Sequence, residues 1–179
     1  SRTYQLGVET TPDNADDKIN FSHAMPRRLT AEQLQDSLVA SMGVPIPFEG
    51  LPVGFRASQL PDSMVKADFL ETFGRPPRES VCECERVAEV SLKQTLNLIN
   101  GSTVGSALAD PANRINKAAA SAASNEALID DVYLAVLCRM PSADERAKGA
   151  EYIAGSPSKA EGAQDLAWAL LNSPGFLFN

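Results

Sequence analysis

Residues 91–101, with the sequence SLKQTLNLING, mark the point at which the chain becomes regularly helical. The Ser91 hydroxyl can cap the backbone amide of Gln94, and the Gln94 side chain can return a hydrogen bond to the cap. Gly101 then ends the run. Apolar residues recur at helical spacing along one face of this segment, at Leu92, Leu96 and Ile99. The segment therefore predicts an amphipathic helix.

Helix signals continue to the C-terminus, and every later proline falls at a junction between periodic segments. Further helices are predicted at residues 103–109, from Asp110-Pro111 to about 119, at 126–139, at 142–154 and at 158–172. Capping boxes open the last two, and we expect Trp168 to fill the core of the helical domain. Short loops between so many helices indicate a mainly α fold, a compact orthogonal bundle of about seven helices with at most short β strands.

Toward the N-terminus, Thr30 and Gln33 form another capping box, and Gly43 supplies a stop. Three apolar residues, Leu34, Leu38 and Met42, follow one face of that helix. Residues 1–29 are predicted to be a loop arm cut from a larger domain, and residues 30–179 the helical domain.

The segment 44–86 holds six of the twelve prolines between positions 45 and 77. Because proline removes amides that helix and sheet require, we expect loops there, with a helical turn at 68–73 and a short strand at 55–60. Apolar residues should hold this proline-rich segment on the core as an ordered wrap. They are Phe48, Leu51, Val53, Phe55, Leu60 and Phe69.

Composition limits the classes of partner. The net charge is −7, and no basic face is evident, which argues against nucleic acid. No apolar run approaches the roughly 20 residues that cross a bilayer, so we expect no transmembrane segment.

Cys82 and Cys84 form a Cys-x-Cys pair that could be free, bridged, redox-active or metal-bound. Together with Cys138 and the single histidine, His23, they could supply a Cys₃His zinc set by count. The paired spacing of zinc motifs is missing, and Cys138 lies on an apolar helix where a buried, inert thiol is the default. We therefore predict no metal site and no cofactor within these 179 residues.

Arg75, Arg78 and Arg86 could cradle an anion such as a sulfate or a carboxylate. Three glutamates in the same stretch, Glu79, Glu83 and Glu85, favour internal ion pairing instead. A hydrolase triad has no base other than His23, and no nucleophile-elbow motif is present. No catalytic residues are predicted, and the balance is against an enzyme.

Five ordered strings resemble the C-terminal domain of unknown function of large secreted planctomycete and verrucomicrobial proteins, which often carry an N-terminal cytochrome-c-type domain. They are SRTYQL at 1–6, RRLTAE at 27–32, FL through FGRPPR at 69–78, CECER at 82–86, and WALLNS with FLFN at 168–179. The resemblance implies a secreted, periplasmic or cell-surface protein that starts partway through its domain, with any haem chemistry in an upstream region. It implies no established activity.

These observations favour a non-catalytic helical domain that scaffolds or docks other domains of the same protein or a secreted partner. Two alternatives stay open. The first is a redox or polysaccharide-processing component that uses Cys82 and Cys84. The second is an anionic-glycan binding module that uses Arg75, Arg78 and Arg86.

Overall fold

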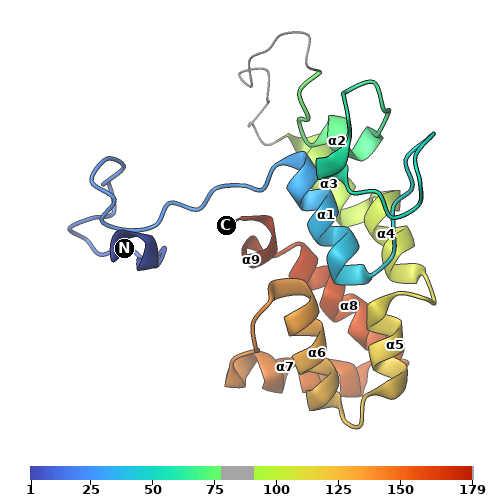
Figure 1. Cartoon of the computed structure of the whole chain (residues 1–179). Coiled ribbons are helices and arrows are strands. Elements are labelled where there is room, and N and C mark those ends of the chain that lie inside the picture. Colours follow the sequence, from blue (N-terminus) through green and yellow to red (C-terminus); the bar gives the residue numbers. More distant parts are fainter. Residues whose placement is uncertain (78–90, 179) are drawn as a thin grey trace.

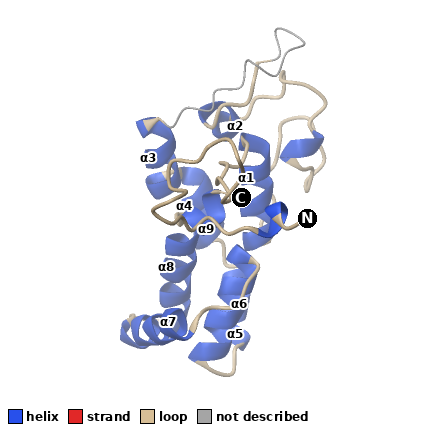
Figure 2. Cartoon of the chain, turned by 90° about the vertical axis from the view of Figure 1, so that its left-hand side faces the viewer, coloured by secondary structure: helices blue, strands red, loops and turns tan. Residues whose placement is uncertain are grey.

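A computed structural model describes residues 1–77 and 91–178, and these residues are mainly helical (Figures 1 and 2). The prediction of a mainly α fold is confirmed, and about seven helices is close to the number observed. Within the described residues the only β pairing is an isolated bridge between Arg28 and Phe178. The helices are α1 Ala31–Met42, α2 Asp68–Thr72, α3 Leu92–Asn100, α4 Ser102–Ala109, α5 Arg114–Ser121, α6 Asn125–Leu137, α7 Ala143–Gly155, α8 Lys159–Leu171 and α9 Pro174–Leu177.

Helix α1 forms as its sequence predicts. The Gln33 amide donates to the Thr30 hydroxyl at 3.3 Å, and the Thr30 amide donates to Gln33 Oε1 at 3.0 Å. Gly43 ends the helix at φ 68°, in the left-handed region that glycine adopts most readily. The apolar face is buried, with exposed fractions of 0–3% at Leu34, Leu38 and Met42.

Helices α1 and α8 organise the core. Helix α8 packs against α4, α5, α6, α7 and α9, while α1 packs against α2, α4, α5 and α6 (Figure 1). Ala163 and Ala167 on α8 are fully buried, and their small side chains permit close helix contacts. The prediction that Trp168 fills the core is wrong, because its side chain is 38% exposed. Alanines and Leu171 occupy the buried face of α8, and the indole lies at its edge.

The proline-rich segment is held on the core by most of the predicted residues. Phe48 and Phe69 are buried, whereas Val53 is 75% exposed. The predicted strand at 55–60 is wrong, because Ala57–Gln59 forms a 3₁₀ turn, η2. The Asp36 carboxylate of α1 accepts hydrogen bonds from the amides of Ala57 at 2.7 Å and Ser58 at 3.1 Å. These charge-assisted bonds stabilise a turn where a strand would need a partner strand.

Helix α5 begins later than Asp110-Pro111 predicts. Its cap is Asn113, which is fully buried and accepts from the Asn116 amide at 2.6 Å. The Asn113 amide group also donates to the carbonyls of Ala107 and Leu108 at the end of α4. Asp110 instead accepts from the Ala112 amide, in a turn. Asparagine can therefore end one helix and start the next, and this tertiary role moves the boundary.

The first residues extend away from the helical body as an arm (Figure 1). The chain joins the body where the Leu29 amide donates to the Leu177 carbonyl at 3.0 Å. This bond places the start of α1 beside α9, close to the C-terminal end of the described chain.

Candidate functional site

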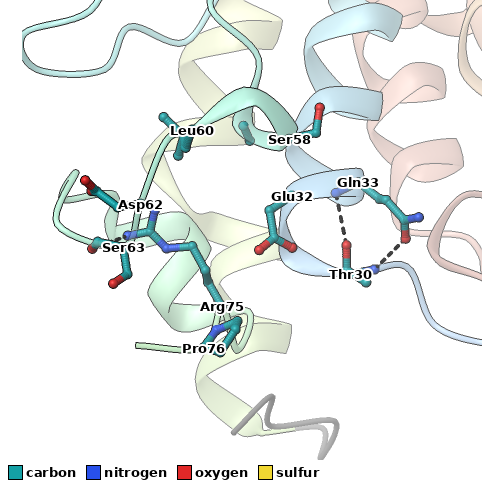
Figure 3. A pocket seen from close by; sticks show the side chains of 10 residues that line it. Thr30, Glu32, Gln33, Ser58, Leu60, Asp62, Ser63, Arg75 and Pro76 are labelled. Carbon is teal, nitrogen blue, oxygen red and sulfur yellow. Dashed lines mark hydrogen bonds between the residues drawn. The ribbon is translucent and has the colours of Figure 1, made fainter. Parts of the chain in front are cut away.

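A polar pocket of about 210 Å³ lies between the start of α1 and the proline-rich segment (Figure 3). Gly74, at φ 85°, turns the chain after α2 and brings Arg75 into the pocket. Two acidic residues line the pocket, Glu32 from α1 and Asp62 from the proline-rich segment, and Figure 3 shows the Glu32 carboxylate on the side of Arg75. The remaining lining residues are Thr30, Gln33, Ala57, Ser58, Leu60, Ser63 and Pro76.

Arg75 is the only predicted anion-binding residue that the structure describes. Its Nη2 donates to the Val65 carbonyl at 2.7 Å and to the Ser63 carbonyl at 3.3 Å. Its Nη1 is buried and makes no hydrogen bond within the described chain. That nitrogen could donate to a carboxylate or a sulfate, but the two carboxylates in the pocket oppose a second anion.

The other predicted site residues, Arg78, Arg86, Cys82 and Cys84, lie outside the described residues. The hypotheses for them therefore remain predictions. No group of three or more potential metal ligands occurs within residues 1–77 and 91–178. His23 lies on the arm, and its Nδ1 is buried without a hydrogen-bond partner.

The prediction that Cys138 is buried is wrong, because this thiol is free and exposed. Cys138 follows α6 as its C-cap and has a φ of 54°. The helix ends at Leu137, two residues before the predicted end at 139, so the Cys138 side chain leaves the apolar face that the helix buries.

Helix α3 forms where the sequence predicts it, but its apolar face points away from the core. The apolar face is exposed to solvent, by 74% at Leu92, 50% at Leu96 and 40% at Ile99. Gln94, on the opposite side of the helix, is only 4% exposed. An α-helix has about 3.6 residues per turn, so Gln94 lies roughly half a turn away from Leu92 and Leu96. Within residues 1–77 and 91–178 nothing covers the apolar face of α3, and we call this surface the α3 face.

Gln94 is buried because its amide connects three segments. Its Oε1 accepts from Arg28 Nη1 at 2.7 Å, and its Nε2 donates to the Thr72 carbonyl at 2.9 Å. Oε1 also accepts from the Ser91 amide at 3.2 Å, which completes the predicted capping box. Arg28 in turn stacks over the Phe73 ring, and this burial lowers the pKa of its guanidinium. Helix α3 is thus attached through these polar groups and through Leu98, which packs against the core.

The α3 face continues into a shallow cavity of about 260 Å³. Apolar side chains line most of it: Leu98, Ile99, Trp168, Leu177 and Phe178. The Trp168 indole donates to the Ile99 carbonyl at 3.1 Å, which joins α8 to the end of α3. Sequence reasoning found the amphipathic pattern but not its direction. The burial of Gln94 depends on Arg28 and Thr72, which no local pattern identifies.

Among the described residues, no helix combines the length and the apolar character that crossing a membrane requires. The longest described helices, α6, α7 and α8, have 13 residues each. This agrees with the prediction of no transmembrane segment in this part of the chain.

Comparison with known proteins gives one match. No curated protein and no solved structure is significantly similar to the chain. The model of the PSD1 family, described as a protein of unknown function (DUF1553), matches residues 56–153. The matched segment includes Arg75 and all of α3, and it covers more than half of the 179 residues. The chain therefore belongs to the PSD1 family of proteins of unknown function, DUF1553.

Proposed function

We propose that this domain is a non-catalytic helical scaffold that docks another domain of the same full-length protein through the α3 face. The observation that carries the proposal is the exposure of Leu92, Leu96 and Ile99 on one side of a helix whose buried side holds Gln94. Three large apolar residues at helical spacing form a contiguous patch, and such patches on soluble proteins often mark interaction sites.

The way α3 is attached supports an exposed docking face rather than a helix that should turn its apolar face onto the core. Gln94 on its buried side is hydrogen-bonded to Arg28 and Thr72, so turning the helix inward would bury leucines only by breaking these bonds. The apolar cavity beside Ile99 extends the surface toward Trp168 and Phe178, which are 38% and 39% exposed. A partner helix laid in this direction would find apolar contacts along its whole length.

The resemblance to secreted, cytochrome-c-associated multidomain proteins suggests which domain is docked and where the protein acts. In that setting the docked domain would be the upstream cytochrome-c-type domain, and the assembly would be periplasmic or at the cell surface. The α3 face would hold that domain in place, and any haem chemistry would belong to the docked domain.

The test is site-specific photocrosslinking in the full-length protein. Benzoylphenylalanine replaces Leu96 in one variant and Lys93, an exposed polar position of the same helix, in the matched control. We expect the probe at position 96 to crosslink to an upstream segment and the probe at 93 to give few products. The proposal fails if both positions crosslink equally poorly, or if the only products join two copies of this domain.

Arg75 favours a second candidate function, binding of an anionic glycan in the polar pocket. Its buried Nη1 without an acceptor is the supporting observation. This candidate predicts binding to dextran sulfate that is lost when salt is added and is weakened in Arg75→Gln. Glu32 and Asp62 in the same pocket make it the weaker proposal.

A further inference from the structure

A second surface lies where α6, α7 and α8 meet; it is apart from the Arg75 pocket and shares only Trp168 with the cavity beside the α3 face. It is an open groove of about 530 Å³, within the size range of small-molecule sites. Tyr133 of α6 forms the floor and is only 5% exposed. Gly149 on α7 and Ala169 on α8 are small, and the groove forms above them. Figure 2 shows α7 and α8 at the end of the bundle away from α2.

Two exposed aromatic side chains stand in this groove. Tyr152 of α7 is 53% exposed and Trp168 of α8 is 38% exposed. Each has its polar atom already held: the Tyr152 hydroxyl donates to Asp165 Oδ2 at 2.9 Å, and the Trp168 indole donates to the Ile99 carbonyl. Because these bonds fix the rings, their apolar surfaces are preorganised for contact with a ligand.

Hydrogen-bond donors and acceptors both lie around the aromatic rings. Asp165 offers its second carboxylate oxygen as an acceptor, and Lys148 makes no hydrogen bond or ion pair with any residue of the described chain. Glu145 is already paired with Arg139, through two bonds of 2.8 Å and 2.6 Å. One carboxylate oxygen of Asp165 and the Lys148 ammonium therefore remain available to a ligand, and the groove has little net charge.

We propose that this groove binds a neutral saccharide. A pyranose ring presents C–H groups on its faces, which suit aromatic surfaces, and hydroxyls on its edge, which need both donors and acceptors. Tyr152 and Trp168 supply the surfaces, and Asp165 and Lys148 supply an acceptor and a donor. A sulfated or uronic polymer would meet two carboxylates, Asp165 and Glu145, and a cationic ligand would meet Lys148. The charges of the groove thus select an uncharged ligand.

The chain contains a single tryptophan, so its fluorescence reports on this groove and on the adjoining cavity of the α3 face, which Trp168 also lines. The experiment titrates the protein with cellohexaose, xylohexaose and maltohexaose, each to about 10 mM. This concentration nearly saturates a site that binds with a Kd of about 1 mM. Dextran sulfate is titrated in parallel. We expect a saturable change in Trp168 emission with at least one neutral hexaose, unaffected by added salt, and no change with dextran sulfate.

Variants locate the effect. Tyr152→Ala should weaken binding by about tenfold or more, because it removes one aromatic surface. Phe21→Ala is the matched control, since it removes an aromatic side chain that is 60% exposed on the arm. Leu96→Asp, which damages the α3 face, should also bind normally, so this proposal and the docking proposal fail separately. Circular dichroism checks that each variant is folded.

Three results would overturn the proposal. The first is that none of the neutral hexaoses alters the emission. The second is that Tyr152→Ala binds as tightly as the unchanged chain. The third is that dextran sulfate alone alters the Trp168 emission and that salt reverses the change, which would show that the groove selects an anionic ligand.

Discussion

Helices α1 and α3 begin with the same local pattern and bury opposite faces. Each has a hydroxyl cap, Thr30 or Ser91, and a glutamine three residues later that closes the capping box. Each then carries large apolar residues at helical spacing. In α1 these residues are 0–3% exposed, whereas in α3 they are 40–74% exposed. Caps and spacing therefore determine where a helix forms, but not which side it buries.

The capping glutamines show the same reversal. Gln33 in α1 is exposed, and it bonds only to its own cap. Gln94 in α3 is buried, and it bonds to Arg28 and Thr72 as well. Buried polar groups need their hydrogen bonds satisfied, and the two distant partners do this for Gln94. Tertiary partners of one glutamine thus decide the orientation of the whole helix.

The largest expected effect comes from truncating one leucine in each helix. Leu38→Ala in α1 should lower the free energy of unfolding by about 2–5 kcal/mol, because it opens a cavity in the core. Leu96→Ala in α3 should change it by no more than about 0.5 kcal/mol, because the side chain is half exposed. Urea unfolding of both variants measures the difference. Similar losses in the two variants would mean that the α3 face is covered in solution.

A smaller effect should follow from the glutamines. Gln94→Ala leaves Arg28 Nη1 and the Thr72 carbonyl without a partner in a partly buried site, which should cost about 1–3 kcal/mol. Gln33→Ala removes one exposed hydrogen bond and should cost less than about 1 kcal/mol. Both values come from the same unfolding experiment. A Gln33 variant that loses as much as the Gln94 variant would contradict the distinction drawn between them.

Most helices could be predicted from sequence because their signals are local. The capping boxes of α1, α3 and α7 all form where the sequence places them. The failures occur where distant residues compete with a local pattern. Asn113 takes the cap of α5 because it also bonds the end of α4, and Asp36 holds Ala57–Gln59 as a turn.

Less of the candidate sites could be predicted. Arg75 was identified from its arginine-rich stretch, but its carbonyl partners and the presence of Asp62 in the same pocket come from the fold. The α6–α7–α8 groove was not predicted at all. Its aromatic residues lie on three helices, and Trp168 was assigned to the core because large aromatic residues are usually well buried. Only the packing of Ala163 and Ala167 shows that the indole is displaced to the edge.

The third capping box offers the smallest effect and adds a pH test to the comparison. In α7 the box residue is Glu145, an acid where α1 and α3 have glutamine. Hydrogen bonds from Arg139 and from the Ser142 backbone lower the pKa of Glu145 from 4.5 to about 2. Its stabilisation is therefore present above pH 4.5 and is lost as the pH falls toward about 2. Since the pair is largely exposed, the loss should not exceed about 1 kcal/mol.

Glu145→Gln isolates that contribution, because it converts the α7 box to the kind found in α1 and α3. The variant should be less stable than the unchanged chain at neutral pH, and the difference should shrink as the pH falls through the range between the two pKa values. Urea unfolding at a series of pH values measures this difference in stability. Glu161→Gln at the start of α8 is the control, because the Glu161 amide donates to the Ser158 cap but the Glu161 carboxylate has no arginine partner within the described chain. A difference that is independent of pH would show that Arg139 does not stabilise the charged form of Glu145. The glutamate in the α7 box would then stabilise its helix no more than the glutamines stabilise α1 and α3. The three helices would differ only in which side chains they bury.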